Sequence, residues 1–147
     1  MNNNLPKLEQ ICEKYNIALL YIYGSQVEAG IKLLEGKKVA ITDPLTDVDI
    51  GIVFDKALPG PRERYILYSS IYNELSDLFT PFPLDLVFIQ ENHSVFQGEV
   101  ICGKCLYYSN IDFKDNYEEN ILRRAADFKP FLEMYYDELL EEIESAH

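Results

Sequence analysis

The stretch Thr46-Asp47-Val48-Asp49-Ile50-Gly51-Ile52-Val53-Phe54 decides the fold. Successive side chains of an extended chain point to opposite faces, so every second residue lies on the same side. One face of this segment is apolar, whereas the other begins with the carboxylates of Asp47 and Asp49 and continues with Gly51. The pattern predicts a core strand over residues 47–54 whose first residues present two acids on one side.

Two further apolar runs predict strands before and after this segment. Residues 17–23 are rich in β-forming residues and end at Gly24-Ser25, which is typical of a buried strand. Residues 84–89 are apolar except for a single acid, Asp85. Residues 106–108 fit a small edge strand.

Apolar residues at three- and four-residue spacing predict helices between these strands. The expected helices cover residues 5–15, 26–35, 62–79, 94–103 and 115–143. Ser94 is a candidate cap of the fourth helix, and Pro130 is expected to break or kink the fifth. Residues 36–46 are predicted to form a loop or a short hairpin arm.

The composition indicates one acidic domain. A chain of 147 residues fits a single domain spanning residues 1–147, and hydrophobic residues, 48% of the total, suffice for a core. The formal net charge is −12, and such a surface repels phosphate backbones, so direct DNA or RNA binding is not expected. A basic protein partner, or a small anion held with metal ions, fits this charge.

Nothing in the sequence predicts a membrane or secreted protein. The longest clean apolar run is Ile17 to Tyr23, whereas a membrane-spanning helix needs about 20 residues. The N-terminus lacks a basic region followed by an apolar stretch, so no signal peptide is expected. Three cysteines, an odd number, do not make a disulfide framework. These observations predict a cytoplasmic protein.

Gly24-Ser25 is the first candidate part of a binding site. The pair lies where a strand is predicted to end and a helix to begin. Glycine lets a ligand approach the backbone closely, and amides at a helix start can hold a phosphate. Taken alone, such a pair is more often an ordinary turn.

Three acids form the second candidate part. Asp47 and Asp49 point to the same side of their strand, which suits a shared divalent cation such as Mg²⁺. If the strand that contains Asp85 lies beside them, three carboxylates converge, as in a two-metal site for phosphoryl or nucleotidyl transfer. The alternative for each acid alone is a structural carboxylate at a solvent-exposed strand end.

In this order, Tyr23-Gly24-Ser25, Thr46-Asp47-Val48-Asp49-Ile50 and Asp85-Leu86-Val87 resemble the minimal nucleotidyltransferases of the DNA polymerase β-like superfamily. The resemblance covers about residues 5 to 143. The segment from Gly98 to Tyr108 and the closing helix resemble the MNT-type members, which are antitoxin partners of HEPN-domain toxins. The resemblance implies an α+β fold, with a small mixed β-sheet flanked by helices and a long C-terminal helix.

The resemblance also implies a chemistry. Members transfer a nucleoside monophosphate, commonly AMP from ATP, with Mg²⁺, and MNT-type antitoxins modify a tyrosine of the partner toxin. Carried over to this sequence, Gly24 and Ser25 would contact the triphosphate, and Asp47 and Asp49 would bind both metals. Asp85 would complete the metal site and could act as a general base.

The chain departs from the family pattern after Gly24-Ser25. Many members carry a basic residue there, whereas this sequence continues with Gln26-Val27-Glu28. The stretch between Ser25 and Asp47 is also longer than usual. Lys37 and Lys38 lie in this extra length, and we hypothesise that they supply the missing positive charge to the phosphates.

Three functions follow as hypotheses. The first is a nucleotidyltransferase that uses ATP and Mg²⁺ and acts as the antitoxin of a HEPN-type toxin. The second is a binding module of the same fold that neutralises a toxin by contact alone, which the missing basic residue favours. The third is nucleotidyl transfer to a small molecule. Homo- and hetero-oligomers both remain open.

Overall fold

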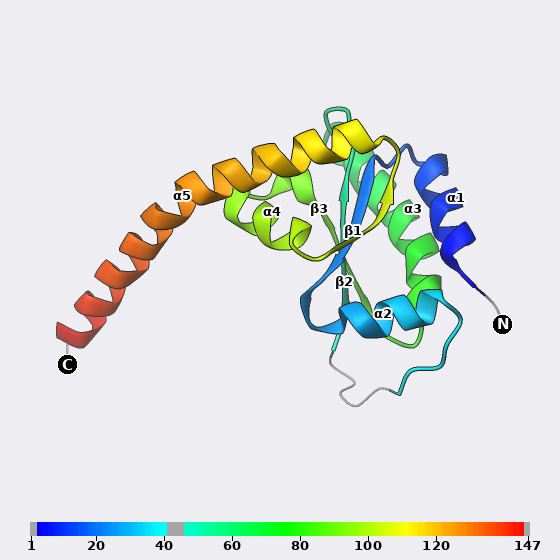
Figure 1. Ribbon diagram of the computed structural model, residues 1–147, viewed down its shortest axis with the longest axis horizontal. Coiled ribbons are helices and arrows are strands. Elements are labelled where there is room, and N and C mark those ends of the chain that lie inside the picture. Colours follow the sequence, from blue (N-terminus) through cyan, green and yellow to red (C-terminus); the bar gives the residue numbers. More distant parts are fainter. Residues whose placement is uncertain (1–2, 41–45, 146–147) are drawn as a thin grey trace.

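The computed structural model describes residues 3–40 and 46–145 and contains a four-stranded sheet with helices on both faces (Figure 1). The strand order is β3-β2-β1-β4. The strands are β1 (Leu19–Tyr23), β2 (Val48–Val53), β3 (Leu84–Phe88) and β4 (Lys104–Tyr108). All four lie where the sequence predicts strands, and β4 is an edge strand as expected, though it begins two residues earlier.

The five helices agree with the predicted pattern, with shifts of a few residues at their ends. They are α1 (Leu5–Lys14), α2 (Val27–Leu34), α3 (Pro61–Phe79), α4 (Ser94–Ile101) and α5 (Ile111–Ser145). Short 3₁₀ turns, η1 (Gly24–Gln26) and η2 (Ile89–Glu91), follow β1 and β3. Of the predicted loop 36–46, residues 36–40 are irregular and residues 41–45 lie outside the described residues.

Two details of the predicted helices need correction. Of the two effects expected of Pro130, a break does not occur, because α5 continues through it to Ser145, and the helix is bent instead (Figure 1). A proline removes one backbone hydrogen bond, which a helix with a solvent-exposed side can accommodate by bending. Ser94 is not the cap of α4 either: His93 is, and its Nδ1 accepts a hydrogen bond from the Phe96 amide at 3.2 Å.

The sheet is mixed, and its topology brings three strand ends together. β1 is antiparallel to both β2 and β4, whereas β2 and β3 are parallel. The end of β1 therefore lies at the same edge of the sheet as the beginnings of β2 and β3. The loop and turn residues that carry the candidate site lie at this edge.

Alternation along the strands creates a core on each face of the sheet. On one face, Val48, Ile50 and Ile52 pack with residues of α1 and α3, including Leu8, Ile71 and Leu75. This confirms the predicted apolar face of the 47–54 segment. On the other face, Leu19 and Tyr21 pack with residues of α4 and the start of α5, including Val100 and Ile121.

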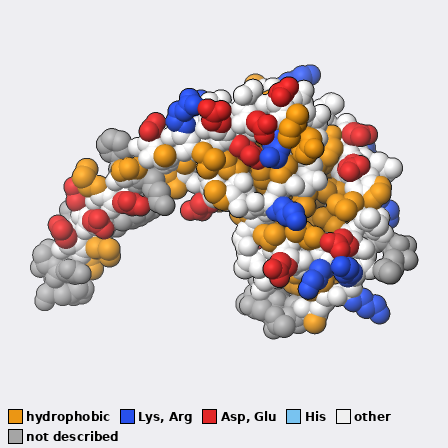
Figure 2. All heavy atoms as spheres, in the orientation of Figure 1, with side chains coloured by type: hydrophobic (Ala, Val, Ile, Leu, Met, Phe, Trp, Pro, Cys, Tyr) orange, Lys and Arg blue, Asp and Glu red, His pale blue; other side chains and the backbone are white. Residues whose placement is uncertain are grey.

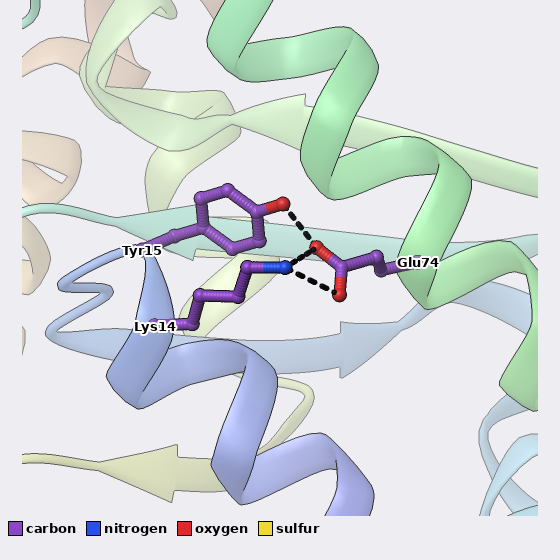
Figure 3. Close-up of polar contacts among 3 residues, drawn as sticks. All are labelled: Lys14, Tyr15 and Glu74. Atoms are coloured by element: carbon purple, nitrogen blue, oxygen red, sulfur yellow. Dashed lines mark hydrogen bonds and ion pairs between the residues drawn. The ribbon is translucent and has the colours of Figure 1, made fainter.

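Polar contacts add to the packing of helices on both faces. On one side, Lys14 Nζ lies 3.1 Å from both carboxylate oxygens of Glu74 in α3, and the Tyr15 hydroxyl also donates to Glu74 (Figure 3). On the other side, the buried Tyr21 hydroxyl donates to Glu118 Oε1 of α5 at 2.8 Å. The first half of α5 is thereby held to the sheet.

Across residues 3–40 and 46–145, none of the helices combines the length and the apolar character that crossing a membrane requires.

Candidate functional site

Asp49 and Asp85 lie directly opposite each other on the parallel strands β2 and β3. Neighbouring strands are about 4.8 Å apart, and residues in register point to the same face. Both acids lie on the α4 side of the sheet, at the edge where the two strands begin. Asp49 is half-buried, whereas Asp85 is exposed.

The third acid, Asp47, precedes β2 and is exposed. It is close enough for its charge to act on Asp49. Within residues 3–40 and 46–145, no three His, Cys, Asp or Glu side chains are already gathered in the arrangement of a metal site. The structure thus pairs two of the predicted acids in register and places the third beside them. Metal binding by the three stays a prediction.

The electrostatics of Asp49 indicate an uncompensated negative charge. Burial raises the pKa of Asp49 to about 6, and the neighbouring Asp85 and Asp47 add to the rise. No described lysine or arginine is among the groups that act on this pKa. Carboxylates in such surroundings gain from a bound cation, because the cation favours their ionised form. The donor set therefore fits a hard divalent ion such as Mg²⁺, which takes carboxylate oxygens.

Gly51 allows close packing of α4 onto the sheet next to the acids. Gly51 is the next residue after Asp49 on the α4 side of β2, and a Cβ built there would lie only 2.7 Å from Val100 Cγ1. The missing side chain lets α4 pack closely onto the sheet at this point. Asp49, which precedes Gly51 on this face, is half-buried and keeps some access to solvent.

Gly24 lies close to Asp49, in a backbone conformation that favours glycine. Its φ is +79°, a left-handed conformation that L-residues with side chains rarely adopt. A Cβ at this position would also collide with Asp49 Oδ2. The following residue, Ser25, is exposed in the turn η1 that leads into α2. The structure therefore brings the predicted Gly24-Ser25 turn next to the predicted acids.

Tyr23 and Phe96 belong to this site and are absent from the sequence-based prediction. Tyr23 is in register with Asp49 on the neighbouring strand, and Phe96 of α4 packs edge-on against its ring at 6.0 Å. Burial raises the pKa of Tyr23, and the charges of Asp49 and Asp85 raise it further. The only sequence signal was the position of Tyr23 directly before Gly24, which does not specify a strand partner.

Lys37 and Lys38 lie after the far end of α2. An eight-residue helix is about 12 Å long, so α2 separates them from the Gly24-Ser25 turn. Both are exposed, and Lys37 Nζ forms an ion pair with Glu35 at 2.8 Å. The structure does not bring these lysines together with the acids, and their predicted role in phosphate binding stays a hypothesis.

Residues 6–112 match the sequence profile of the family described as polymerase beta, nucleotidyltransferase. No curated protein matches the chain by sequence.

Several solved structures share the fold. A double aspartate-to-glutamate variant of the MntA–HpeT toxin–antitoxin is 14% identical, with a TM-score of 0.62 over 96% of this chain and 98% of that chain. A chain from a tri-AMPylated Shewanella oneidensis HEPN toxin in complex with an MNT antitoxin is 15% identical, with a TM-score of 0.62 over 93% and 96%. A toxin–antitoxin structure with AMP-PNP is 15% identical, with a TM-score of 0.61 over 96% and 98%. At these identities the likeness shows a shared fold, including the mixed sheet and the long last helix.

Proposed function

The chain belongs to the polymerase beta nucleotidyltransferase family, and from this premise we propose that it transfers AMP from ATP, with Mg²⁺, to a tyrosine of a HEPN-type toxin. Through this modification it acts as an antitoxin. The observation that carries the proposal is the pairing of Asp49 with Asp85 beside Gly24, at one edge of the sheet. Such an arrangement of acids costs free energy and is understandable as a site for cations and phosphates.

The reaction forms one phosphorus–oxygen bond and breaks another. The acceptor hydroxyl oxygen attacks the α-phosphorus of ATP, the bond from that phosphorus to the α,β-bridging oxygen breaks, and pyrophosphate leaves. In this proposal Asp85 accepts the hydroxyl proton as general base. Asp47, Asp49 and Asp85 would hold Mg²⁺, which would supply positive charge to the phosphates and make the attacking oxygen more acidic.

In this proposal the Gly24-Ser25 turn binds the triphosphate. Without a Cβ, Gly24 leaves room for Asp49 and lets the triphosphate approach the backbone. The Ser25 hydroxyl and the amides at the start of the turn can donate hydrogen bonds to phosphate oxygens. Lys37 and Lys38 are proposed to add positive charge to the nucleotide.

The proposal for the partner is supported by the shared fold. The relative with the same fold is described in complex with a tri-AMPylated HEPN toxin. The formal net charge of −12 suits a basic protein partner and disfavours nucleic acid. We also propose that residues 1–147 form a single domain and that the protein works in the cytoplasm.

The experiment that tests this function uses α-labelled ATP, Mg²⁺ and a co-purified HEPN-type toxin. Label on the toxin is expected with the natural chain and lost with Asp47→Asn, Asp49→Asn. Asp55→Asn changes an exposed acid after the other end of β2 and serves as the control that keeps activity.

Other outcomes would point to the other two functions. Label on a small molecule would retain the enzyme class and overturn the antitoxin role. An unlabelled toxin that is nevertheless neutralised by the natural chain, and equally by the double variant, would identify a binding module on a nucleotidyltransferase fold.

A further inference from the structure

The second half of α5 projects away from the rest of the molecule (Figure 1). From residue 126 to residue 143, every side chain that the structure describes is exposed. Isolated helices of this length are only marginally stable in water, and helices in proteins normally gain their stability by packing one face. Beyond Phe128, whose ring lies near that of His93, the described side chains of this half give the helix no such packing.

Apolar side chains lie on one side of α5, first beside α4 and again near the end of the helix, and together they define an apolar line. Leu140 comes 18 residues after Leu122, and Ile143 comes 18 residues after Ala125. That separation corresponds to about five full turns, so each pair lies on one line along the helix. Leu122, Leu140 and Ile143 are about half exposed, at 49%, 56% and 49%. Such a line of aliphatic side chains in water marks an interaction surface.

The line is continuous with a groove on the body of the protein. Leu122, Ala125 and Ala126 of α5 form one wall of a mostly apolar groove of about 430 Å³, and Val95 and Gly98 of α4 contribute to the other. A partner that covers Leu140 and Ile143 can follow the same side of α5 to this groove.

Charge indicates what kind of partner fits. Residues 127–147 contain seven acidic residues and one lysine. Glu133 lies about two turns before Leu140 and on the same side of the helix, and Asp137 lies about one turn before Leu140 and beside that side. Figure 2 shows acidic and hydrophobic side chains side by side on this half of the helix. A second copy of α5 would bring like charges together, which disfavours a dimer through this face.

We propose that the second half of α5 is the surface on which the acceptor protein docks, through an apolar ridge bordered by lysines and arginines. This proposal rests on the proposed function and names the recognition surface that it needs. The apolar ridge covers Leu140 and Ile143 and extends toward the groove between α4 and α5, while the bordering cations meet Glu133 and Asp137.

Contacts between aromatic rings connect this surface to the acids. The Phe128 ring on α5 lies 6.3 Å from the ring of His93, the cap of α4. Within α4, Phe96 packs against Tyr23, which is in register with Asp49. An acceptor seated along α5 therefore lies beside the helix that borders the acid pair, which is where its hydroxyl has to arrive.

The test measures binding of the full chain to the HEPN-type toxin that co-purifies with it. Leu140→Ser, Ile143→Ser should raise the dissociation constant at least about tenfold. Met134→Ser is the matched control, because Met134 is exposed to the same degree, 58%, but lies about 120° around the helix from Leu140. Glu133→Lys, Asp137→Lys should slow association and reduce its dependence on salt.

The controls separate this proposal from the proposed function. Asp47→Asn, Asp49→Asn should bind the toxin with unchanged affinity while losing transfer. Equal affinity of the natural chain and Leu140→Ser, Ile143→Ser would overturn the docking surface, whether or not AMP is transferred. Selective loss of affinity in a chain that never transfers AMP would uphold the docking surface and overturn the enzymatic role. A dimer of the chain alone that Leu140→Ser, Ile143→Ser dissociates would show a second copy on this face and overturn the proposal.

Discussion

Asp49 and Asp85 stand opposite each other in register on two parallel strands, and the pKa of Asp49 rises to about 6 as a result of burial and of this neighbour. Two acids that repel each other at a partly covered sheet edge do not stabilise the fold. A bound cation would relieve this repulsion. Stability without ligand and function with it should therefore respond in opposite directions to changes at this pair.

Without divalent cations, Asp49→Asn should stabilise the protein at pH 7. The pKa of Asp49 lies above the ordinary value of 3.8, so between about pH 4 and pH 6 the folded state binds more protons than the unfolded state. The unfolding free energy of the natural chain therefore falls as pH rises through this window. Removing the charge should recover on the order of 1 kcal/mol at pH 7, after allowance for the solvent exposure of Asp49.

Urea unfolding at several pH values checks this prediction. The variant should show a smaller loss of stability than the natural chain between acidic and neutral pH. Asp55→Asn, which replaces an exposed acid beyond the other end of β2, should follow the natural profile. A clear destabilisation by Asp49→Asn at pH 7 would indicate that Asp49 is a structural hydrogen-bonding residue.

Mg²⁺ should stabilise the natural chain and not the acid variant. A ligand that binds only the folded state adds about 1.4 kcal/mol at ten times its dissociation constant. The melting temperature of the natural chain should rise with Mg²⁺, and that of Asp47→Asn, Asp49→Asn should stay constant. An equal rise in both proteins would place the cation elsewhere.

Gly24→Ala should damage transfer more than it damages stability. Gly24 and Gly36 both have positive φ, +79° and +82°, so alanine at either position costs about 1 kcal/mol in backbone strain. Only at Gly24 does the added Cβ collide with Asp49. Displacing a reacting group by about 1 Å can cost roughly a hundredfold in rate. Comparing the two variants by unfolding and by labelled-ATP transfer separates strain from displacement, and equal transfer rates would contradict the role of Gly24.

Lys37→Ala, Lys38→Ala tests the origin of positive charge at the nucleotide. If these lysines serve the phosphates, the apparent dissociation constant for ATP should rise by roughly tenfold, equivalent to about 1.4 kcal/mol. Isothermal titration with Mg²⁺ present gives this constant, and Lys56→Ala, an exposed lysine beyond the other end of β2, is the control. An unchanged constant would exclude both lysines from binding the phosphates.

Local patterns were sufficient to predict much of the fold. The alternation in residues 47–54 and 84–89 predicted strands that the structure contains as β2 and β3. Helix spacing predicted all five helices, since an amphipathic period is a property of neighbouring residues. The prediction of Ser94 as the cap of α4 was wrong. Ser94 and the preceding His93 can both accept a hydrogen bond, and in the structure His93 does so. Whether a helix breaks or bends at Pro130 depends on contacts with the rest of the molecule. The local sequence carries no information about those contacts.

The candidate site residues could be chosen from the sequence, whereas their arrangement in space could not be predicted from it. Gly24, Asp47, Asp49 and Asp85 could be chosen from their residue types and strand positions. Tyr23 could not, since its place beside Asp49 depends on the pairing of β1 with β2. Lys37 and Lys38 follow the end of α2 that is opposite the Gly24-Ser25 turn, and their role in phosphate binding stays a hypothesis.

The sequence by itself determined the periodic elements, the acidic surface and the three carboxylates, because each is a property of composition or of spacing within a few residues. Only the tertiary structure decided that Asp85 stands opposite Asp49, that Gly24 must lack a side chain to make room for that acid, and that the second half of α5 extends beyond the core. These relationships join segments far apart in the chain. They are fixed by strand register and by which faces pack together, and local preference cannot specify either.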